Sequence, residues 1–431
     1  AAMVLAGAVA ARAGERYAAQ NGQTPDPGGA YASWAAAASN IQDAVNAAAT
    51  NDTVWIGAGR YTAGTNSVDW AGTNVVYIGR PLTLRSSNGL PESVVIDGGG
   101  SNRGVAVVYA ASTPYRFVLD GLTVSGCAAT VTSVLTDVRC YGGGILFKPP
   151  HGVAWTGEVR NCVIRDNTIG PGASYVFGSA IHMGYQSSGG CFLLVTNCVV
   201  RGNRALTGSG AFYLGGKAGA LVTRCLIETN YAKGQGGGFY PAMSLTVIEH
   251  CVIRSNRSDA SAGAVRVGGQ TLMRNCLVHH NGNDALMAIN GRLDIYNCTV
   301  VDNIGWGARM DNVSGAALNI FNSIVYSNSG GNLHTILPGT WMFTNVCSYP
   351  TNSYFYLAGT GNITNPPAFA DAAARNYRLS ADSPCLQAGL YQDWMAGAVD
   401  LDGHARVDRF FRAVDMGCYE RLGAGSLFGG R

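Results

Sequence analysis

The stretch from residue 197 to residue 230 reads NCVVRGNRALTGSGAFYLGGKAGALVTRCLIETN and decides the fold of this chain. It begins and ends with one motif: a polar residue, Cys, two mostly apolar residues, two mostly polar residues and Asn. Successive cysteines lie 22 to 36 residues apart, at Cys162, Cys198, Cys225, Cys251, Cys276 and Cys298. The Asn always falls five residues after the Cys place, at Asn167, Asn203, Asn230, Asn256, Asn281, Asn303 and Asn328, the last after Ser323 in place of Cys. Repeats of this period indicate stacked supersecondary units.

The composition of the repeat predicts strands. Its apolar residues are Val, Ile, Leu and Phe in short runs bounded by Gly and Asn, which is typical of strands and turns. A second strand signal led by Gly or Ala opens each unit, as in residues 209–216 (SGAFYLGG) and 262–269 (AGAVRVGG). We therefore expect an all-β fold, a right-handed parallel β-helix of about ten coils over residues 53–420, with neighbouring coils about 4.8 Å apart.

The repeated Cys and Asn are predicted to form two interior ladders. Cys is among the most buried residue types and behaves as a small hydrophobe. Parallel Cβ vectors in stacked strands do not meet disulfide geometry, and the close spacing of zinc ligands is absent. Stacked Asn amides bond one another along the axis, and Asn also tolerates the left-handed conformation.

The N-terminal residues predict a signal peptide followed by a helix that caps the end of the stack. Residues 1–13 (AAMVLAGAVAARA) resemble the tail of a secretory signal peptide, so we expect an exported protein, secreted or at the cell surface. Residues 40–49 predict one amphipathic helix with Ser39 or Asn40 as its N-cap, which would cover the first coil. The resulting division is 1–13 signal peptide remnant, 14–52 extension and capping helix, 53–340 β-helix, and 341–431 C-terminal coils and cap leading to a possible anchor.

Six cysteines lie outside the ladder. Cys127 and Cys140 flank one loop and could pair in an exported protein. No pairing is assigned to Cys191, Cys347, Cys385 and Cys418.

Both ends of the chain resemble a known group. Residues 34–61 (W-x5-NIQDAVNAA-x3-DTV-x2-G-x-G-x-Y) resemble the opening of secreted bacterial right-handed parallel β-helix proteins with the pectin-lyase-like fold. The coils are more loosely similar to repeats of chlamydial polymorphic outer-membrane proteins. Residues 361–369 (GNITNPPAF), 377–389 (YRLSADSPCLQAG), 400–406 (DLDGHAR) and 415–420 (DMGCYE) resemble the end of the same secreted group, where such a region often precedes a surface-anchoring tail. The resemblance implies the fold and an extracellular location.

The charge of the chain and three of its acidic residues bear on which partners and ions it could bind. Only 13% of residues are charged, the formal net charge is +3, and no run of five basic residues occurs, so nucleic acid is not expected as a partner. No stretch of 18 apolar residues predicts a transmembrane segment, and we expect a monomer without a cofactor. Asp400, Asp402 and Glu420 leave two alternatives open, a calcium site or a simple Asx-turn.

One outward column of the Gly/Ala-led strands is the candidate binding site. Aligning these strands by their small residue gives Leu146, His182, Tyr213, Tyr240, Arg266, Met287, Met310 and His334. The run His182, Tyr213, Tyr240 and Arg266 spans four coils, about 15 Å. Aromatic rings can stack on sugars, Arg can hold a carboxylate, and a His/Tyr pair could transfer a proton. The alternative is that these residues simply suit solvent-facing strand positions.

Two further features bear on this face. The insertion between Cys162 and Cys198, with Tyr175, Tyr185 and Gln186, could wall one side of the column. A second outward column three residues after each Cys is expected to form a surface charge ladder of little energetic weight, comprising Arg165, Arg201, Glu228, Arg254 and His279.

Three functions remain open from the sequence. The first is a non-catalytic exported protein that contacts polysaccharide or surface glycan along one face. The second is a polysaccharide lyase or glycoside hydrolase of the pectin-lyase-like fold, and the third is a structural spacer. The outward columns show neither the clustered Asp and basic residue of a pectate-lyase type of lyase nor the paired carboxylates of a hydrolase, which favours the first.

Overall fold

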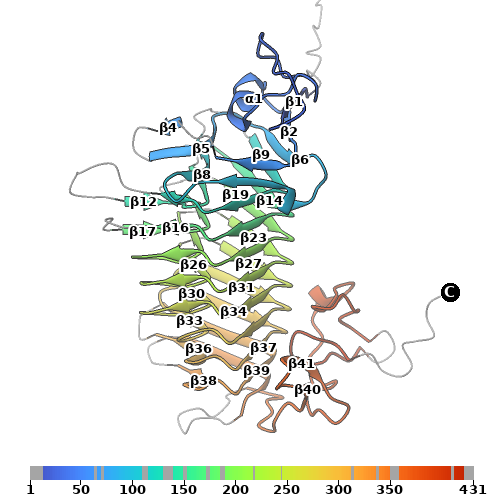
Figure 1. Ribbon diagram of the computed structural model, residues 1–431. Coiled ribbons are helices and arrows are strands. Elements are labelled where there is room, and N and C mark those ends of the chain that lie inside the picture. Colours follow the sequence, from blue (N-terminus) through green and yellow to red (C-terminus); the bar gives the residue numbers. More distant parts are fainter. Residues whose placement is uncertain are drawn as a thin grey trace, which may run out of the picture.

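The protein is a stack of β-coils in this computed structural model, with its strands layered along one axis (Figure 1). The structure describes residues 13–62, 66–68, 72–108, 115–129, 139–148, 153–170, 175–184, 190–216, 219–243, 245–311, 315–335, 339–349, 359–408 and 412–421. Among these residues the strands form two long sheets of 21 and 11 strands and a shorter one of five, here called sheets A, B and C. Almost every pairing is parallel and joins neighbouring repeats, which confirms the predicted parallel β-helix.

Coils in the middle of the stack contribute strands to all three sheets, whereas the described coils nearer either end have none in sheet C. The coil that begins with β22 (Phe212–Leu214) in sheet B continues through β23 (Gly219–Thr223) and β24 (Leu226–Glu228) in sheet A to β25 (Tyr231–Ala232) in sheet C. The other strands of sheet B are β4 (Asn66–Val68), β5 (Gly72–Ile78), β8 (Arg103–Val108), β13 (Ile145–Lys148), β18 (Ile181–Met183), β26 (Phe239–Pro241), β30 (Val265–Val267), β33 (Leu286–Ala288), β36 (Trp306–Met310) and β38 (Gly331–His334). The other strands of sheet C are β11 (Ala128–Ala129), β16 (Thr168–Ile169), β21 (Arg204–Ala205) and β29 (Arg257–Ser258).

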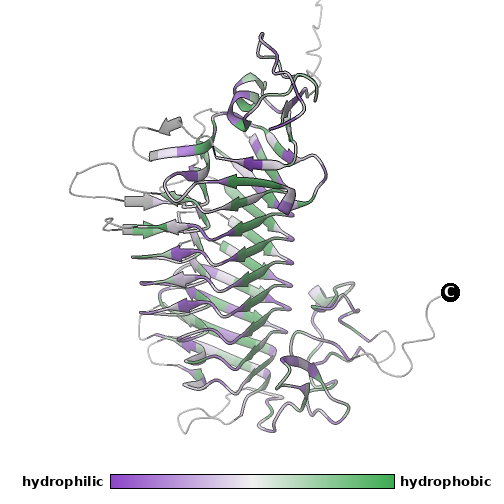
Figure 2. Cartoon of the chain, in the orientation of Figure 1, coloured by the Kyte–Doolittle hydropathy of each residue, from purple (hydrophilic) through white to green (hydrophobic). Residues whose placement is uncertain are grey.

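Sheet A wraps two faces of the stack. Its first face also comprises β1 (Glu15–Ala18), β2 (Thr53–Ile56), β6 (Thr83–Ser86), β9 (Tyr115–Asp120), β14 (Trp155–Arg160), β19 (Cys191–Thr196), β27 (Leu245–Glu249), β31 (Gln270–Arg274), β34 (Arg292–Tyr296), β37 (Ala317–Tyr326) and β39 (Thr340–Cys347). Its second face also comprises β3 (Gly59–Tyr61), β7 (Val94–Asp97), β10 (Thr123–Ser125), β15 (Val163–Arg165), β20 (Val199–Arg201), β28 (Val252–Arg254), β32 (Leu277–His279) and β35 (Thr299–Val301). Apolar residues follow the strands at every level of the stack (Figure 2).

Left-handed residues make the corners between the faces. The residue before each ladder Cys has positive φ, as at Asn197 (53°) and Arg224 (53°). The residue before each ladder Asn does too, as at Gly202 (65°) and Thr229 (55°). The ladder asparagines themselves are not among the positive-φ residues, so the tolerance of Asn for the left-handed conformation is not used at these positions. Their role is hydrogen bonding, because the corner is turned by the residue before them.

Both predicted ladders occupy the interior. The ladder cysteines are 0–3% exposed, and the ladder asparagines are buried. Each Asn Nδ2 donates to the Oδ1 of the next, over 2.8–3.1 Å from Asn167 to Asn328. The described cysteine side chains are free thiols. Cys127 is one of them, with its Sγ 3.2 Å from the Ser125 carbonyl, so it forms no disulfide with Cys140 in this structure.

The N-terminal end is capped as predicted. Helix α1 (Ile41–Ala47) begins after Asn40, whose Oδ1 accepts a hydrogen bond from the Asp43 amide at 2.9 Å. Strand β1 pairs in parallel with β2. Parallel stacking therefore begins at Glu15, ahead of the residue 53 expected from the sequence.

The C-terminal end differs from the expectation that coils continue to residue 420. After β39 and a bridge from Cys347 to Ile363, the chain leaves the stack and runs back beside sheet A (Figure 1). This return segment, residues 365–421, contains the antiparallel pair β40 (Phe369–Asp371) and β41 (Asn376–Leu379) and the short 3-10 helix η2 (Asp393–Met395). Within the described residues no helix is both long and apolar enough to cross a membrane.

Candidate functional site

The predicted column on sheet B exists as a register of directly opposed residues. Leu146 pairs with His182, His182 with Tyr213, and Tyr213 with Tyr240. Farther along, the column runs through Arg266, Met287, Arg309 and His334. The alignment of the Gly/Ala-led strands is thus confirmed for all but one strand.

The exception is β36, where Arg309 stands in the outward column that was assigned to Met310. Ala308 pairs with Leu286, and Met310 pairs with Ala288, both inward positions. Met310 is accordingly fully buried. A shift of one residue exchanges the two faces of a strand, so counting from the wrong small residue placed an interior side chain outside.

Four side chains form a continuous strip, here called the aromatic–arginine strip: His182, Tyr213, Tyr240 and Arg266. The rings of His182 and Tyr213 stack at 5.2 Å and 4°. The ring of Tyr240 stands edge-on to Tyr213 at 5.6 Å. The guanidinium carbon of Arg266 lies 4.6 Å from the centre of the Tyr240 ring, a cation–π distance.

The members of the strip differ in exposure. Tyr213 and Tyr240 are half-buried, whereas His182 is only 1% exposed. Tyr141 covers His182, with ring centres 4.7 Å apart, and Phe177 packs on Tyr213 at 4.4 Å. Burial lowers the pKa of His182 to about 3, so its imidazole stays neutral near pH 7. His182 therefore supports the Tyr213 ring, and the two tyrosines are the surface that a ligand can meet.

Tyr141 and Phe177 were not singled out from the sequence. They end β12 (Arg139–Tyr141) and β17 (Tyr175–Phe177), a parallel pair that projects beside sheet B (Figure 1). Each aromatic residue precedes a positive-φ glycine, Gly142 or Gly178, three residues before the next sheet B strand begins. That shared aromatic–Gly pattern is the signal that could have found them.

The predicted side wall is only partly described. The backbone of Tyr175 pairs with Arg139 in this projection, and Tyr185 and Gln186 lie outside the described residues. Tyr141 and Phe177 are the described aromatic neighbours of the strip on this side.

Arg266 is a buried cation without a carboxylate partner among the described residues. It is 7% exposed, and its buried Nη1 donates to no acceptor among the described residues. Arg309, two coils farther, is paired with Asp284 at 3.1 Å. Buried charges are normally paired because desolvation is costly. The Arg266 site is therefore suited to an anionic group brought by a ligand.

The second outward column is in register as predicted, but its members have different surroundings. Glu228 pairs with Arg254 at 2.7 Å, while Arg201 is exposed. His279 is 2% exposed beneath Tyr377 of the return segment, with ring centres 5.4 Å apart. Burial lowers the pKa of His279 to about 3. The column is a charge ladder in its middle and a docking surface at one end.

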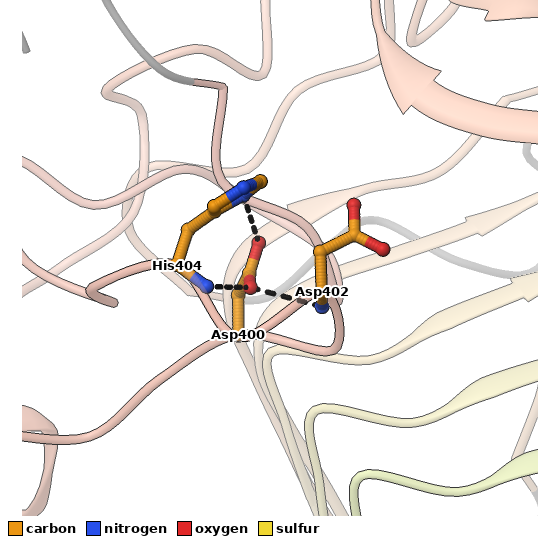
Figure 3. A group of neighbouring side chains, drawn as sticks. All are labelled: Asp400, Asp402 and His404. Carbon is orange, nitrogen blue, oxygen red and sulfur yellow. Dashed lines mark hydrogen bonds and ion pairs between the residues drawn. The ribbon is translucent and has the colours of Figure 1, made fainter. Parts of the chain in front are cut away.

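Asp400, Asp402 and His404 gather in one turn (Figure 3), with ligand-type atoms within 4.8 Å of one another. The Oδ1 of Asp400 accepts from the amides of Asp402 (3.0 Å) and His404 (2.7 Å). Its Oδ2 accepts from the Glu420 amide at 2.7 Å. Arg378 binds both carboxylate oxygens of Asp402 at 2.6 Å.

These contacts already engage the carboxylates that a calcium ion would need. The Glu420 carboxylate faces Arg406 and is absent from the three-residue group. The Asx-turn left open by the sequence is present at Asp400, whose Oδ1 accepts from the amides of Asp402 and His404.

Comparison with known proteins agrees with this architecture. Residues 179–345 match a family model described as the right handed beta helix region. The crystal structure of pectate lyase Pel9A aligns with a TM-score of 0.56 and 14% identity, covering 95% of this chain and 96% of that one. The protein is a right-handed parallel β-helix.

A second solved structure, a mannuronic acid specific polysaccharide family 6 lyase from human gut microbiota, aligns with a TM-score of 0.28 and 11% identity, covering 74% of this chain and 86% of that one. No curated protein sequence matches the chain significantly. At 14% identity the similarity to pectate lyase Pel9A establishes the fold alone, and activity has to be argued from the side chains.

Proposed function

We propose that this β-helix is an exported or cell-surface protein that binds an acidic polysaccharide along the aromatic–arginine strip. The observation that carries the proposal is Arg266, a nearly buried guanidinium that stacks on Tyr240 and pairs with no described carboxylate. A uronate carboxylate would supply the missing anion through charge-assisted hydrogen bonds.

The neighbouring rings suit the rest of a sugar chain. Tyr213 and Tyr240 are half-buried and lie on successive coils, about 4.8 Å apart along the axis. Aromatic side chains combine a large apolar face with a polar tip, so the two rings can contact sugar rings while their hydroxyls stay in water. The polysaccharide class is supported by the fold neighbour, which is a pectate lyase, and the export by the resemblance of residues 1–13 to a signal peptide.

The side chains of the aromatic–arginine strip support binding of a polysaccharide rather than its cleavage. Proton abstraction needs a base with access to the ligand and a pKa near the working pH. The one imidazole of the strip is covered, and its pKa is about 3. The other three members are two phenols and an arginine.

Affinity electrophoresis in gels containing polygalacturonate, alginate or a neutral glucan tests the proposal. We expect retardation by a polyuronate. The double substitution Tyr213→Ala/Tyr240→Ala should weaken binding about tenfold or more, and Arg266→Met should weaken binding to the acidic polymers selectively. Arg201→Ala, an exposed arginine on another face, is the matched control and should bind normally.

Retention of polyuronate binding by both the double variant and Arg266→Met would refute the strip as the site. Release of unsaturated uronates by the wild-type protein would replace simple binding with lyase activity.

A further inference from the structure

A hollow lies at the N-terminal end of the stack, and none of the aromatic–arginine strip residues lines it. It has a volume of about 450 Å³ and is lined by Ala19, Gln20, Asn21, Trp34, Gly57, Ala58 and Ser87. We call it the Trp34 pocket. Its lining comes from three segments: the loop after β1, the corner between β2 and β3, and the loop after β6. Its volume falls in the range of small-molecule sites, about 300–1,000 Å³.

Small residues keep this space open. A Cβ added to Gly57 would lie 3.4 Å from Cζ3 of Trp34 and 3.4 Å from the Ala18 carbonyl oxygen. These are ordinary van der Waals distances, so the indole packs directly beside the backbone of the β2–β3 corner, and a larger side chain at position 57 would extend into the space next to it. Ala19 and Ala58 extend the floor without filling it.

The walls are held in place by contacts within the cap. The Gln20 amide donates to the Arg60 carbonyl, and its Oε1 accepts from the Arg60 amide at 3.0 Å. Tyr17 supports Trp34 by an edge contact, with ring centres 4.8 Å apart and planes at 65°. A site organised before binding loses less entropy when the ligand arrives.

Trp34 is unusually open for its type. Its side chain is 42% exposed, although Trp is highly buried on average. Because the Tyr17 ring packs against it, the exposed indole is a supported platform at the mouth of a hollow. An ordered aromatic surface of this kind is suited to the apolar face of a ligand ring.

The polar groups of the pocket are neutral. Asn21 and Ser87 are exposed, and neither side chain hydrogen-bonds to another described residue. They offer an amide and a hydroxyl, both of which donate and accept. None of the seven lining residues is charged. The pocket thus lacks the cation that an acidic sugar would require.

We propose that the Trp34 pocket binds a neutral sugar residue, with its ring on the indole and its hydroxyl groups on Asn21 and Ser87. This site is separate from the aromatic–arginine strip and does not depend on it. The protein would then carry two sites of different specificity, one for an acidic chain and one for a neutral sugar unit.

Isothermal titration with cellohexaose, mannohexaose, xylohexaose and oligogalacturonate, using the full chain, tests the proposal. At least one neutral oligosaccharide should bind. Trp34→Ala, which removes the platform, and Gly57→Val, which fills the hollow, should each weaken that binding about tenfold or more. Trp34→Phe should restore part of it, because a smaller ring remains.

Two controls separate this site from other effects. Leu90→Ala changes an apolar residue that is 59% exposed and lies outside the pocket lining, so binding should not change. Tyr213→Ala/Tyr240→Ala should also leave neutral-sugar binding intact, even if it abolishes binding of polyuronate. The proposal is overturned if none of the neutral oligosaccharides binds, or if folded Trp34→Ala and Gly57→Val bind them as the wild type does.

Discussion

At the scale of single residues, the interior asparagines are the most constrained positions of the fold. Asn256 donates from Nδ2 to the Ile227 carbonyl (2.9 Å) and to Asn281 Oδ1 (3.1 Å). Its Oδ1 accepts from the backbone amide (3.0 Å) and the Nδ2 (2.9 Å) of Asn230. One side chain thus satisfies polar groups of three successive coils.

The ladder thiols also make hydrogen bonds: Cys225 Sγ accepts from the Cys198 amide at 3.4 Å and donates to the Thr223 carbonyl at 3.2 Å. Ser323 Oγ makes the same two contacts, with the Cys298 amide (3.1 Å) and the Phe321 carbonyl (2.7 Å), which explains why serine can take the Cys place.

Asn256→Ala should lower the free energy of unfolding by about 2–4 kcal/mol, because it leaves several buried polar groups without partners. Urea unfolding followed by circular dichroism measures the change. Lys233→Ala, at an exposed position of the preceding coil, is the control and should differ from the wild type by about 0.5 kcal/mol or less. Equal stability of the two variants would show that the amide ladder is not needed.

At the scale of elements, the turns that lead into sheet B depend on close approach of backbone between coils. A Cβ at Gly237 would lie 2.5 Å from the carbonyl oxygens of Arg257 and Gly263. At Gly210 it would lie 2.1 Å from the Gly237 carbonyl oxygen. Stacked glycines therefore let successive turns pack directly on one another, which sets where each sheet B strand begins and so aligns the aromatic–arginine strip.

Gly237→Ala should cost about 1–3 kcal/mol, since the methyl group overpacks against backbone that belongs to the next coil. The matched control is Gly282→Ala, whose Cβ would have side-chain carbons of Arg257, and not backbone, as its three nearest neighbours, at 3.1 Å or more. Thermal unfolding of both variants should show a clear loss for Gly237→Ala and a much smaller one for Gly282→Ala. A reversed order would contradict the packing argument.

At the scale of the whole molecule, the return segment joins the far end of the chain to the side of the stack. Arg406 is fully buried there, with Nη2 donating to Asn275 Oδ1 and to the Gly417 carbonyl, each at 2.7 Å. Glu420 pairs with it. Burial raises the pKa of Glu420 to about 8, although Arg406 opposes the shift. The pKa of nearby Asp415 is raised by burial as well.

Docking of the return segment should therefore weaken as pH rises. A carboxyl group whose pKa is raised in the folded state holds a proton there that it loses when unfolded. Its stabilising contribution is complete below the ordinary pKa of 4.5 and is lost as pH approaches about 8. Hydrogen exchange of residues 398–421 at pH 5 and pH 8.5, corrected for intrinsic rates, should show more opening at the higher pH. Glu420→Gln should reduce this difference, and an unchanged pH dependence in that variant would exclude Glu420 as its source.

Much of this architecture was determined by the sequence alone. The Cys and Asn spacing predicted the parallel β-helix, its two interior ladders and, for most strands, the outward column. These features follow from local rules. Successive side chains of a strand point to opposite faces, and equivalent positions in stacked coils have the same surroundings. Helix α1 was equally predictable, because Asn40 and the apolar face of residues 41–48 are a local signal.

Only the tertiary structure decided what covers these surfaces. Tyr141 lies on His182, from which it is 41 residues away in sequence. Tyr377 of the return segment lies on His279, from which it is 98 residues away. The one-residue shift at Arg309 and the Trp34 pocket, where three separate loops meet, depend in the same way on where distant segments come together. The sequence repeat shows which face of the sheet a side chain points to. Whether that side chain is buried depends on residues far away in the sequence, and the repeat does not contain that information.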